Sequence, residues 1–343
     1  MALFVKQYGQ SSLSIERDVY VCASASIVGT KEGQGPLAAY FDKVVKDDQM
    51  GCHTWEDAES KLQKEAVIMV LEKAKKQPSD IRYLIAGDLL GQSIATSFGL
   101  MDFEIPLFGL YGACSTCGES LGLASILLAS GAAEHIISVT SSHFASAEKE
   151  FRFPMEYGNQ RPPSSTWTVT GSGAFVLGTK KSELTKVKIA GVTTGKIIDY
   201  GIKDPMNMGA CMAPAACDTI MRNFEDFGRT PDYYDRIITG DLGSVGQEVL
   251  WKLMKEQGYD LSGNHIDCGI EIYDSDVQDT KAGGSGCGCS AVTMASYILP
   301  KIESGDWKRV LFIPTGALMS KTSYNEGQTI PSIAHGVVLE QIL

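Results

Sequence analysis

The chain has 343 residues, of which 44% are hydrophobic and 21% charged, a composition that excludes disordered and fibrous proteins. Its 30 Lys and Arg against 41 Asp and Glu give a formal net charge of −11, which opposes attraction to nucleic-acid phosphates. We therefore expect no nucleic-acid partner.

The N-terminus has only a short apolar start before Lys6, so it lacks the apolar core of a secretory signal peptide. The best apolar stretch, residues 121–133, is shorter than the roughly twenty residues that a membrane-spanning helix needs. We therefore expect a soluble chain without a signal peptide or transmembrane segment. The nine cysteines have no disulfide-framework spacing, and we expect reduced thiols.

Apolar runs of strand length alternate with amphipathic segments of helix length, which predicts an α/β fold. In the first half we expect strands at residues 19–28, 82–86, 106–111, 135–140 and 173–177, and helices at 55–76 and 115–130. In the second half we expect strands at 187–194, 236–239, 310–314 and 335–340, and helices at 210–227, 245–257 and 290–302.

Two internal echoes indicate that the chain is duplicated. Residues 85–89 (IAGDL) are matched by residues 238–242 (ITGDL), and GACSTCGESLGLASILLASG aligns with GGSGCGCSAVTMASYILPKIESG. We therefore expect two similar halves, residues 1–180 and 181–343. Packed side by side, such halves place equivalent helix N-termini at a shared seam, which is a natural ligand site.

One long segment interrupts the first half before its last strand. Residues 142–170 are polar, contain prolines and show no periodicity. Loops of this length inside a compact domain are uncommon and usually functional. We expect this segment to cover the seam.

Cys114 stands where an expected strand ends and an expected helix begins. A thiol at a helix N-terminus lies near the positive end of the helix dipole and near backbone N–H groups, which favour a thiolate or a bound anion. The alternative is a small buried residue that packs the helix start. Cys114 aligns with Ser285 in the other half, and both interpretations stay open.

The pairs Cys114/Cys117 and Cys287/Cys289 raise the question of a zinc site. We expect no metal site and no cofactor, because Cys117 falls inside a predicted helix and no histidine is near either pair in the sequence.

Two histidines and two aspartates could reach the seam. His143 opens the long segment, and His335 begins the last strand between two small residues. Asp88 and Asp241 occupy matched strand ends. The alternative for each histidine is an ordinary core or surface residue, and the alternative for each aspartate is a helix cap.

The duplicated halves, the cysteine at a strand-to-helix turn and the glycine turn AGGSGCGCSAV resemble the thiolase and β-ketoacyl synthase superfamily. The resemblance spans nearly the whole chain and implies a thiolase-like, duplicated five-layer αβαβα fold. It also implies an acyl intermediate on Cys114, with two further side chains, His and His or His and Asn, that activate the thiol and polarise the acyl carbonyl.

The second half departs from that catalytic pattern. The strand end where synthases carry a catalytic His has Thr239-Gly240-Asp241, and the glycine turn that supplies the Asn has Gly284-Ser285-Gly286. Condensation would lack its hydrogen-bond donors without those groups. We therefore expect a non-catalytic binding protein, with acyl transfer through Cys114 as the alternative.

Segments such as IAGDLLGQ, FGLYGACST and TIPSIAHGVV are similar to a family of sporulation proteins within that superfamily. This resemblance implies that the chain binds dipicolinic acid, pyridine-2,6-dicarboxylate, alone or as its Ca²⁺ chelate, for uptake into the developing spore. It also implies membrane-protein partners in the same uptake assembly and a peripheral location at the spore inner membrane.

A flat aromatic dianion is compatible with the seam, since helix N–H groups would bind one carboxylate and His or Ser side chains the other. An aspartate there would have to be protonated, bind the proton of the ring nitrogen, or meet the bound Ca²⁺. The expected ligand-binding residues are Asp88, Cys114, Ser115, His143, Ser164, Ser165 and His335.

Members of the superfamily usually dimerise by antiparallel pairing of a first-half strand that follows the cysteine helix. The resemblance therefore also implies a homodimer.

Overall fold

Strands and helices follow one another in the same order in both halves of the chain. The structure is a computed structural model that describes residues 4–151, 161–182 and 185–342. The first half contains β2 (Ser12–Val28), α1 (Trp55–Ala74), β4 (Tyr83–Gly87), α2 (Ile94–Leu100), β5 (Leu107–Gly109), α3 (Thr116–Ala129), β6 (His135–Ser142) and β8 (Gly171–Gly178). The second half contains β9 (Val187–Thr193), α5 (Met208–Phe227), β10 (Arg236–Thr239), α6 (Gly243–Glu256), β11 (His265–Asp267), α9 (Cys287–Thr293), α10 (Leu299–Glu303), β13 (Arg309–Ile313) and β16 (Gly336–Gln341).

The strand order within the sheet is also the same in both halves. It is β5-β4-β6-β8-β2 in the first half and β11-β10-β13-β16-β9 in the second. In each half the three strands at the outer end are parallel and the last two pairings are antiparallel. β2 and β9 then pair antiparallel and join the halves. This symmetry agrees with a duplicated fold, whereas the boundary between residues 180 and 181 stays a prediction.

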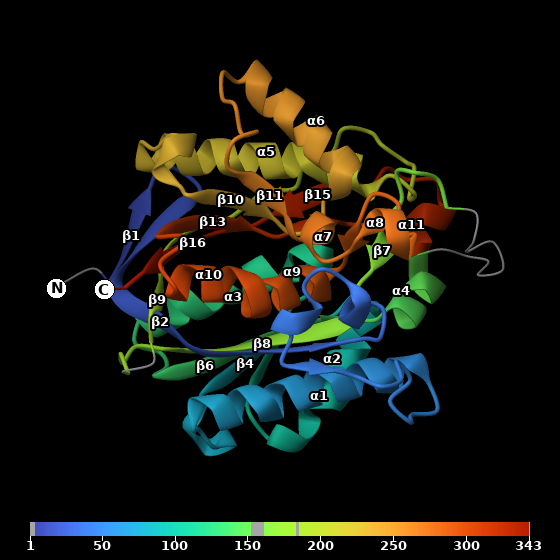
Figure 1. Cartoon of the computed structure of the whole chain (residues 1–343). Coiled ribbons are helices and arrows are strands. Elements are labelled where there is room, and N and C mark those ends of the chain that lie inside the picture. The colour runs from blue at the N-terminus through green and yellow to red at the C-terminus, as the bar shows by residue number, and fades with distance from the viewer. Residues whose placement is uncertain (1–3, 152–160, 183–184, 343) are drawn as a thin grey trace.

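The elements form five layers, as Figure 1 shows. α3 and the helix made by α9, a π-helical turn at Met294–Ile298 and α10 lie between the two halves of the sheet. α1 and α2 cover the outer face of the first half, and α5 and α6 cover that of the second. The predicted thiolase-like αβαβα fold is therefore confirmed.

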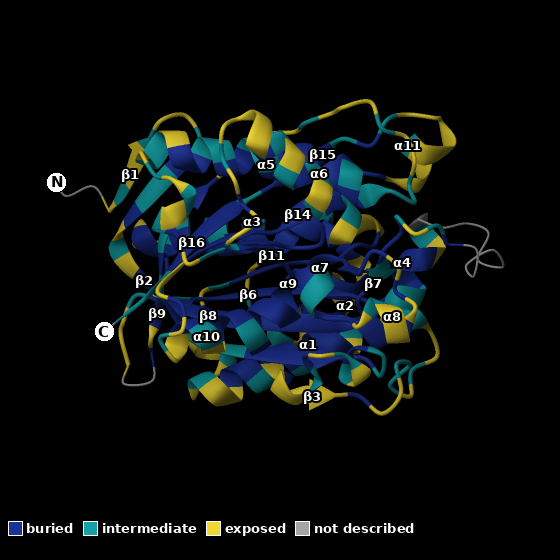
Figure 2. Ribbon diagram, turned by 45° about the horizontal axis from the view of Figure 1, so that its top comes forward, coloured by how far each residue is buried: buried dark blue, intermediate teal, exposed yellow. Residues whose placement is uncertain are grey.

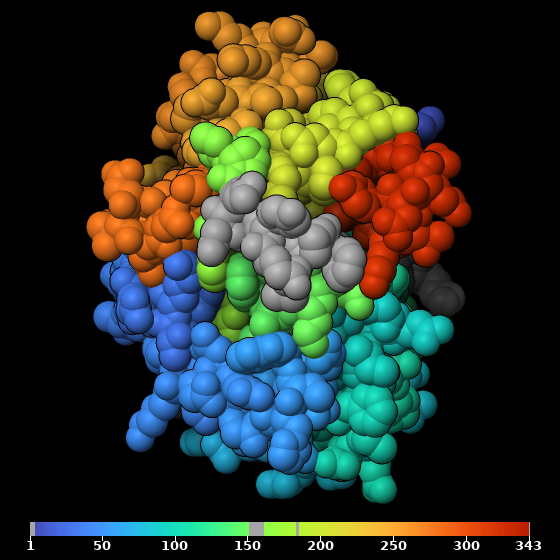
Figure 3. Space-filling view, turned by 90° about the vertical axis from the view of Figure 1, so that its right-hand side faces the viewer, coloured from blue at the N-terminus to red at the C-terminus, as the bar shows by residue number. Residues whose placement is uncertain are grey.

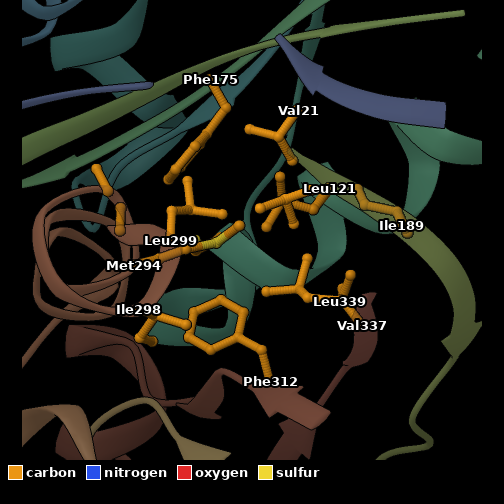
Figure 4. Close-up of a cluster of buried hydrophobic side chains, with 14 of the residues drawn as sticks. Val21, Leu121, Phe175, Ile189, Met294, Ile298, Leu299, Phe312, Val337 and Leu339 are labelled. Atoms are coloured by element: carbon orange, nitrogen blue, oxygen red, sulfur yellow. The ribbon is translucent and has the colours of Figure 1, made fainter. Parts of the chain in front are cut away.

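The largest hydrophobic core lies between the layers and draws on both halves. Phe175 of β8, Leu121 of α3, Met294, Phe312 of β13 and Leu339 of β16 belong to one cluster of buried side chains, seen in Figure 4. Figure 2 shows the same distribution, with buried residues in the sheet and central helices and exposed residues on the outer helices. Each fully buried side chain of this kind contributes roughly 1.5–3 kcal/mol.

The two longest outer helices, α1 and α5, begin and end at matching signals. The Thr54 hydroxyl accepts the Asp57 N–H at 3.1 Å, and the Asn207 side chain accepts the Ala210 N–H at 3.4 Å, so each helix has a side-chain N-cap. α5 ends at Gly228 in the left-handed conformation. These local signals explain why the sequence predicted both helices well.

Short elements were harder to predict. The segment 142–170 contains a helix, α4 (Phe144–Phe151), and a two-residue strand, β7 (Trp167–Thr168), while residues 152–160 lie outside the described residues. Unexpected too were α2, β11, β1 (Val5–Tyr8), β3 (Lys43–Val44), α7 (Cys268–Glu271), α8 (Ser275–Gln278), β12 (Gly284–Ser285), β14 (Thr315–Ala317), α11 (Lys321–Asn325) and β15 (Ser332–Ala334). Within the described ranges, we find no helix with the length and apolar character needed to cross a bilayer.

A buried carboxyl of α1 fastens α4 to the rest of the first half. Glu59 has no exposed surface, and its carboxylate accepts the Ser141 hydroxyl at 2.8 Å and the Ser146 hydroxyl of α4 at 2.6 Å. Burial, and secondarily the nearby carboxyl of Asp88, raise the pKa of Glu59 to about 8. Glu59 is therefore largely protonated at neutral pH.

Close approach of α9 to the sheet generates a prediction about Gly288. A Cβ at this position would lie 2.5 Å from Ser142 Oγ and 2.6 Å from Gly171 O, so Gly288→Ala should destabilise the fold by about 1–3 kcal/mol in urea unfolding. Gly122 of α3 is the matched control, because its added Cβ would meet only Val192, at 3.7 Å. Gly122→Ala should be neutral or stabilising by up to about 1 kcal/mol, and equal effects of the two variants would contradict this packing.

The buried Glu59 carboxyl generates a prediction about pH. Its pKa in the fold lies above the ordinary 4.5, so its contribution to stability is complete below pH 4.5 and is lost as the pH rises through about 8. Glu59→Gln cannot titrate, and the decline of unfolding free energy over that range should become shallower by up to about 1.4 kcal/mol per pH unit. The exposed Glu256→Gln should retain the wild-type slope, and an unchanged slope in Glu59→Gln would refute the assignment.

Candidate functional site

Cys114 lies in a tight turn between β5 and α3. Ala113 has a φ of 52°, a conformation that costs a non-glycine residue about 1 kcal/mol or more. The Ser115 hydroxyl donates to Gly112 O at 2.7 Å, and the Thr116 hydroxyl donates to Ala113 O at 2.7 Å. These bonds hold the thiol at the start of the cysteine helix, where the sequence predicted it.

A small cavity of about 30 Å³ adjoins Cys114, with room for about one water molecule. Its walls come from both halves of the chain, including the α4 segment, so the expected seam and its expected cover are both present. The lining residues are Leu89, Ala113, Cys114, Glu148, Thr168, Met208, Ser285, Ala317 and Met319. Cys114 and Ser285, aligned in the repeat, thus face the same space.

The Asp241 side chain forms a hydrogen bond with the Cys114 thiol. Its carboxylate also accepts the Gly286 N–H at 2.9 Å and the Thr315 hydroxyl at 2.7 Å. Burial raises the pKa of Asp241 to about 7, although these three hydrogen bonds favour the ionised form. A carboxyl that is part protonated at neutral pH therefore occupies the strand end where synthases carry a catalytic His.

Burial disfavours ionisation of the Cys114 thiol. Burial, followed by the charge of Asp241 and the nearby Cys287, raises the pKa of Cys114 well above its ordinary value, and only the Gly286 backbone opposes this shift. Nucleophilic cysteines require a lowered pKa or an adjacent base that takes the proton. The local geometry thus favours a neutral thiol.

The matched aspartates Asp88 and Asp241 have different roles. The Asp88 carboxylate accepts the Leu90 N–H at 2.8 Å and both the N–H and the hydroxyl of Thr96, so it caps α2. In the second half the corresponding loop is held by Asp267 of β11, which accepts backbone N–H groups from residues 242, 243 and 269. Asp241 is consequently free to bond Cys114, and Asp88, which we expected at the ligand, does not line the cavity.

His143 forms hydrogen bonds at the start of α4 and does not line the cavity. Its Nδ1 accepts the Ala145 N–H at 3.2 Å, so Nε2 carries the proton and donates to Asp48 O at 2.9 Å. Its ring packs on Trp55 with centroids 5.4 Å apart. Burial lowers the pKa of His143, so the ring is neutral and fully engaged.

The remaining expected ligands also have other partners. Ser115 closes the turn described above, Ser164 donates to Met206 O at 3.0 Å, and Ser165 donates to Pro162 O at 2.8 Å. His335 lines a separate pocket of about 210 Å³ beside Glu119, and burial lowers its pKa to about 4. The structure therefore brings only Cys114 of the expected set into the cavity.

Sequence reasoning missed Asp241 as the thiol's partner, although the repeat had marked its position. It also missed Glu148 and Met319, for which the sequence carried no signal. All nine cysteines are free thiols, and the described ranges contain no group of three or more His, Cys, Asp or Glu side chains arranged to hold a metal.

Solved structures share the fold at low sequence identity. A tetronic acid condensing enzyme, AbyA1, superposes with a TM-score of 0.59 at 16% identity over 94% of this chain and 99% of that one. Cerulenin-bound OleA of Xanthomonas campestris gives 0.58 at 14% identity over 93% and 96% of the two chains. 3-Oxoacyl-[acyl-carrier-protein] synthase III of Aquifex aeolicus VF5 gives 0.55 at 12% identity over 94% and 99%.

Sequence comparison is more specific. The family model for stage V sporulation protein AD matches residues 9–340. The stage V sporulation protein AD of Bacillus subtilis (strain 168) is 43% identical over 339 residues, which cover 98% of both chains. Together with the duplicated fold and the cysteine turn, these matches show that the chain belongs to the stage V sporulation protein AD family.

Proposed function

We propose that this chain is a non-catalytic sporulation protein that binds dipicolinic acid at the Cys114 cavity for uptake into the developing spore. The observation that carries the proposal is the buried Asp241 carboxyl beside the thiol, in the place of a catalytic base. A cavity of this ancestry retains its shape and its helix terminus without the groups for condensation, which suits it to hold a small acid.

Charge favours the calcium chelate over the free dianion. Glu148 lines the cavity and Asp241 bonds its thiol, whereas no lysine or arginine is among the described residues that line it. A bare dicarboxylate would be repelled there unless Asp241 were protonated. Ca²⁺ takes six to eight oxygen ligands, so a chelated ion would accept carboxylate oxygens from the protein as well as from the acid.

Three of the other expected residues hold the backbone segments that carry the lining of the cavity. Asp88 fixes the loop that carries Leu89, Ser115 closes the turn that carries Cys114, and His143 fixes the start of α4. We propose that these residues act on binding through the shape of the cavity. For Ser164, Ser165 and His335, the proposed contact with the ligand is supported only by the sequence resemblance.

Acyl transfer is the second candidate, because the fold is that of condensing enzymes and a cysteine occupies the helix start. The raised pKa of Cys114 weighs against it, because burial and the charge of Asp241 both disfavour the thiolate. We propose no cofactor of the protein's own. Membrane proteins of the spore uptake assembly are the proposed partners, which would place the chain at the spore inner membrane.

We further propose that a second copy of the chain binds at the free edge of β5. β5 pairs only with β4 among the described strands, and β6, which follows the cysteine helix, lies inside the sheet between β4 and β8. The strand expected from the resemblance is therefore not available for pairing. If two β5 edges pair antiparallel about a two-fold axis, the backbone N–H and C=O groups on both edges gain hydrogen-bond partners.

The surface around β5 has the character that such an interface needs. Large apolar side chains are exposed there, which is unusual for a surface that faces only water. They are Ile94, Phe98, Met101, Leu107, Phe108 and Tyr111, between 40% and 64% exposed.

Titration calorimetry tests the ligand. Dipicolinic acid should bind saturably, more tightly with Ca²⁺ present, and picolinate or isophthalate should bind weakly because each lacks one of the chelating groups. Cys114→Ala and Asp241→Asn should weaken binding by about tenfold or more, the loss expected for one hydrogen bond to a charged group. Cys22→Ala, a half-buried thiol outside the cavity, is the control. Absence of dipicolinate binding, with acylation of Cys114 by an acyl-CoA, would establish the enzyme instead.

Light scattering of the eluted protein tests the second copy. The wild-type chain should have the mass of a dimer, and Phe108→Asp should give a monomer because a carboxylate would be buried in the interface. Tyr200→Asp, at a more exposed aromatic residue on a loop outside β5, should remain dimeric. A wild-type monomer would rule out the β5 interface.

A further inference from the structure

The Cys114 cavity is adjacent to a second, larger space. This outer pocket has a volume of about 290 Å³, and its lining includes Tyr111, Ser320 and Ser323. The two spaces share three wall residues, which are Leu89, Ala113 and Met319. These three side chains therefore separate the thiol from the outer pocket.

Met319 has the most adaptable side chain of the three. Leu89 is buried within the loop that Asp88 holds. Ala113 presents only a methyl group on a turn tied by hydrogen bonds. Met319 has an unbranched side chain that changes rotamer easily.

The backbone around Met319 is anchored, and its side chain is buried in the same hydrophobic cluster as Ala317 and Ile330. The Met319 N–H donates to Ala317 O at 3.0 Å, and the Leu318 N–H donates to Pro331 O at 2.7 Å. Figure 3 shows this segment, in red, beside the yellow segment near residue 202, where the Ile330 N–H donates to Ile202 O at 2.7 Å. A rotation of the Met319 side chain thus requires no movement of the loop.

Size makes such a movement necessary. The inner cavity holds about one water molecule, and pockets for small-molecule ligands usually measure about 300–1,000 Å³. The outer pocket alone lies at the lower limit of that range. A ligand that touches the Cys114 thiol must therefore extend through both spaces and displace Met319.

We propose that the Met319 side chain is the gate between the outer pocket and Cys114, and that it limits which ligands reach the thiol. The gate admits a compact ligand with one end near the thiol and the other beside Tyr111 in the outer pocket. The identity of that ligand rests on the proposed function, whereas the gate itself does not.

Alkylation of Cys114 tests the gate without any natural ligand. Iodoacetamide modification, followed by mass spectrometry of the Cys114 peptide, should be about tenfold faster or more in Met319→Ala than in the wild type, which corresponds to a lowered barrier to entry. Met221→Ala is the matched control, since Met221 is a partly buried methionine of α5 that lines neither of these two spaces. It leaves the wall intact and should stay within about twofold of the wild type.

Two results would overturn the gate: an unchanged rate in Met319→Ala, or equal acceleration in Met221→Ala. Met319→Leu, which keeps the volume with a branched side chain, should react at the wild-type rate and guards against a folding defect in the alanine variant. Dipicolinate with Ca²⁺ should protect Cys114 in Met319→Ala. Fast alkylation without protection would retain the gate and refute the proposed ligand.

Discussion

The central layer is enclosed by a sheet on each of two sides, and this constraint governs the rest of the structure. α3 and the α9–α10 helix lie between the two halves of the sheet, so the side chains that they turn toward the strands are mostly small or apolar. Gly288 meets the backbone of β8, and Ser120 bonds Ser138 of β6. The same constraint explains the buried thiols at Cys117 and Cys289, which pack as small apolar residues.

Duplication supplies a second organising principle, and divergence between the halves creates the site. Both halves begin their central helices near one cavity, and both end an earlier strand with an aspartate. In the first half that aspartate caps the following helix. In the second half Asp267 has taken over this task, which leaves Asp241 to meet the thiol. The chemistry of the site thus depends on a residue that does not line it.

The sequence was informative where a local pattern decides the outcome. Hydrophobic periodicity located the long helices and the central strands, and the internal echo aligned Cys114 with Ser285, which line the same cavity. β11 has only three residues, and β7 and β12 have two each, so periodicity cannot reveal them. α4 was missed because its segment is polar and is held by the distant Glu59.

Side-chain direction could not be predicted from spacing. His143, Ser164 and Ser165 lie near the site in the chain, yet each forms its hydrogen bonds with backbone carbonyls. Which buried donor finds which acceptor is decided by competition among groups far apart in sequence. Asp88 and Asp241 illustrate this, because similar local motifs, IAGDL and ITGDL, acquire different partners.

Residues 107–113 combine three features that were described separately. They contain the free edge of β5, Tyr111 of the outer pocket and the strained turn at Ala113 before the thiol. Backbone this short cannot adjust at one end without loading the other. If a second copy pairs with β5 while a ligand occupies the cavity, dimerisation and ligand binding become linked. Dimerisation must then change the affinity for the ligand by the same factor by which the ligand changes the affinity between the two copies. A dimer of this chain would then contain two ligand sites that communicate across its symmetry axis.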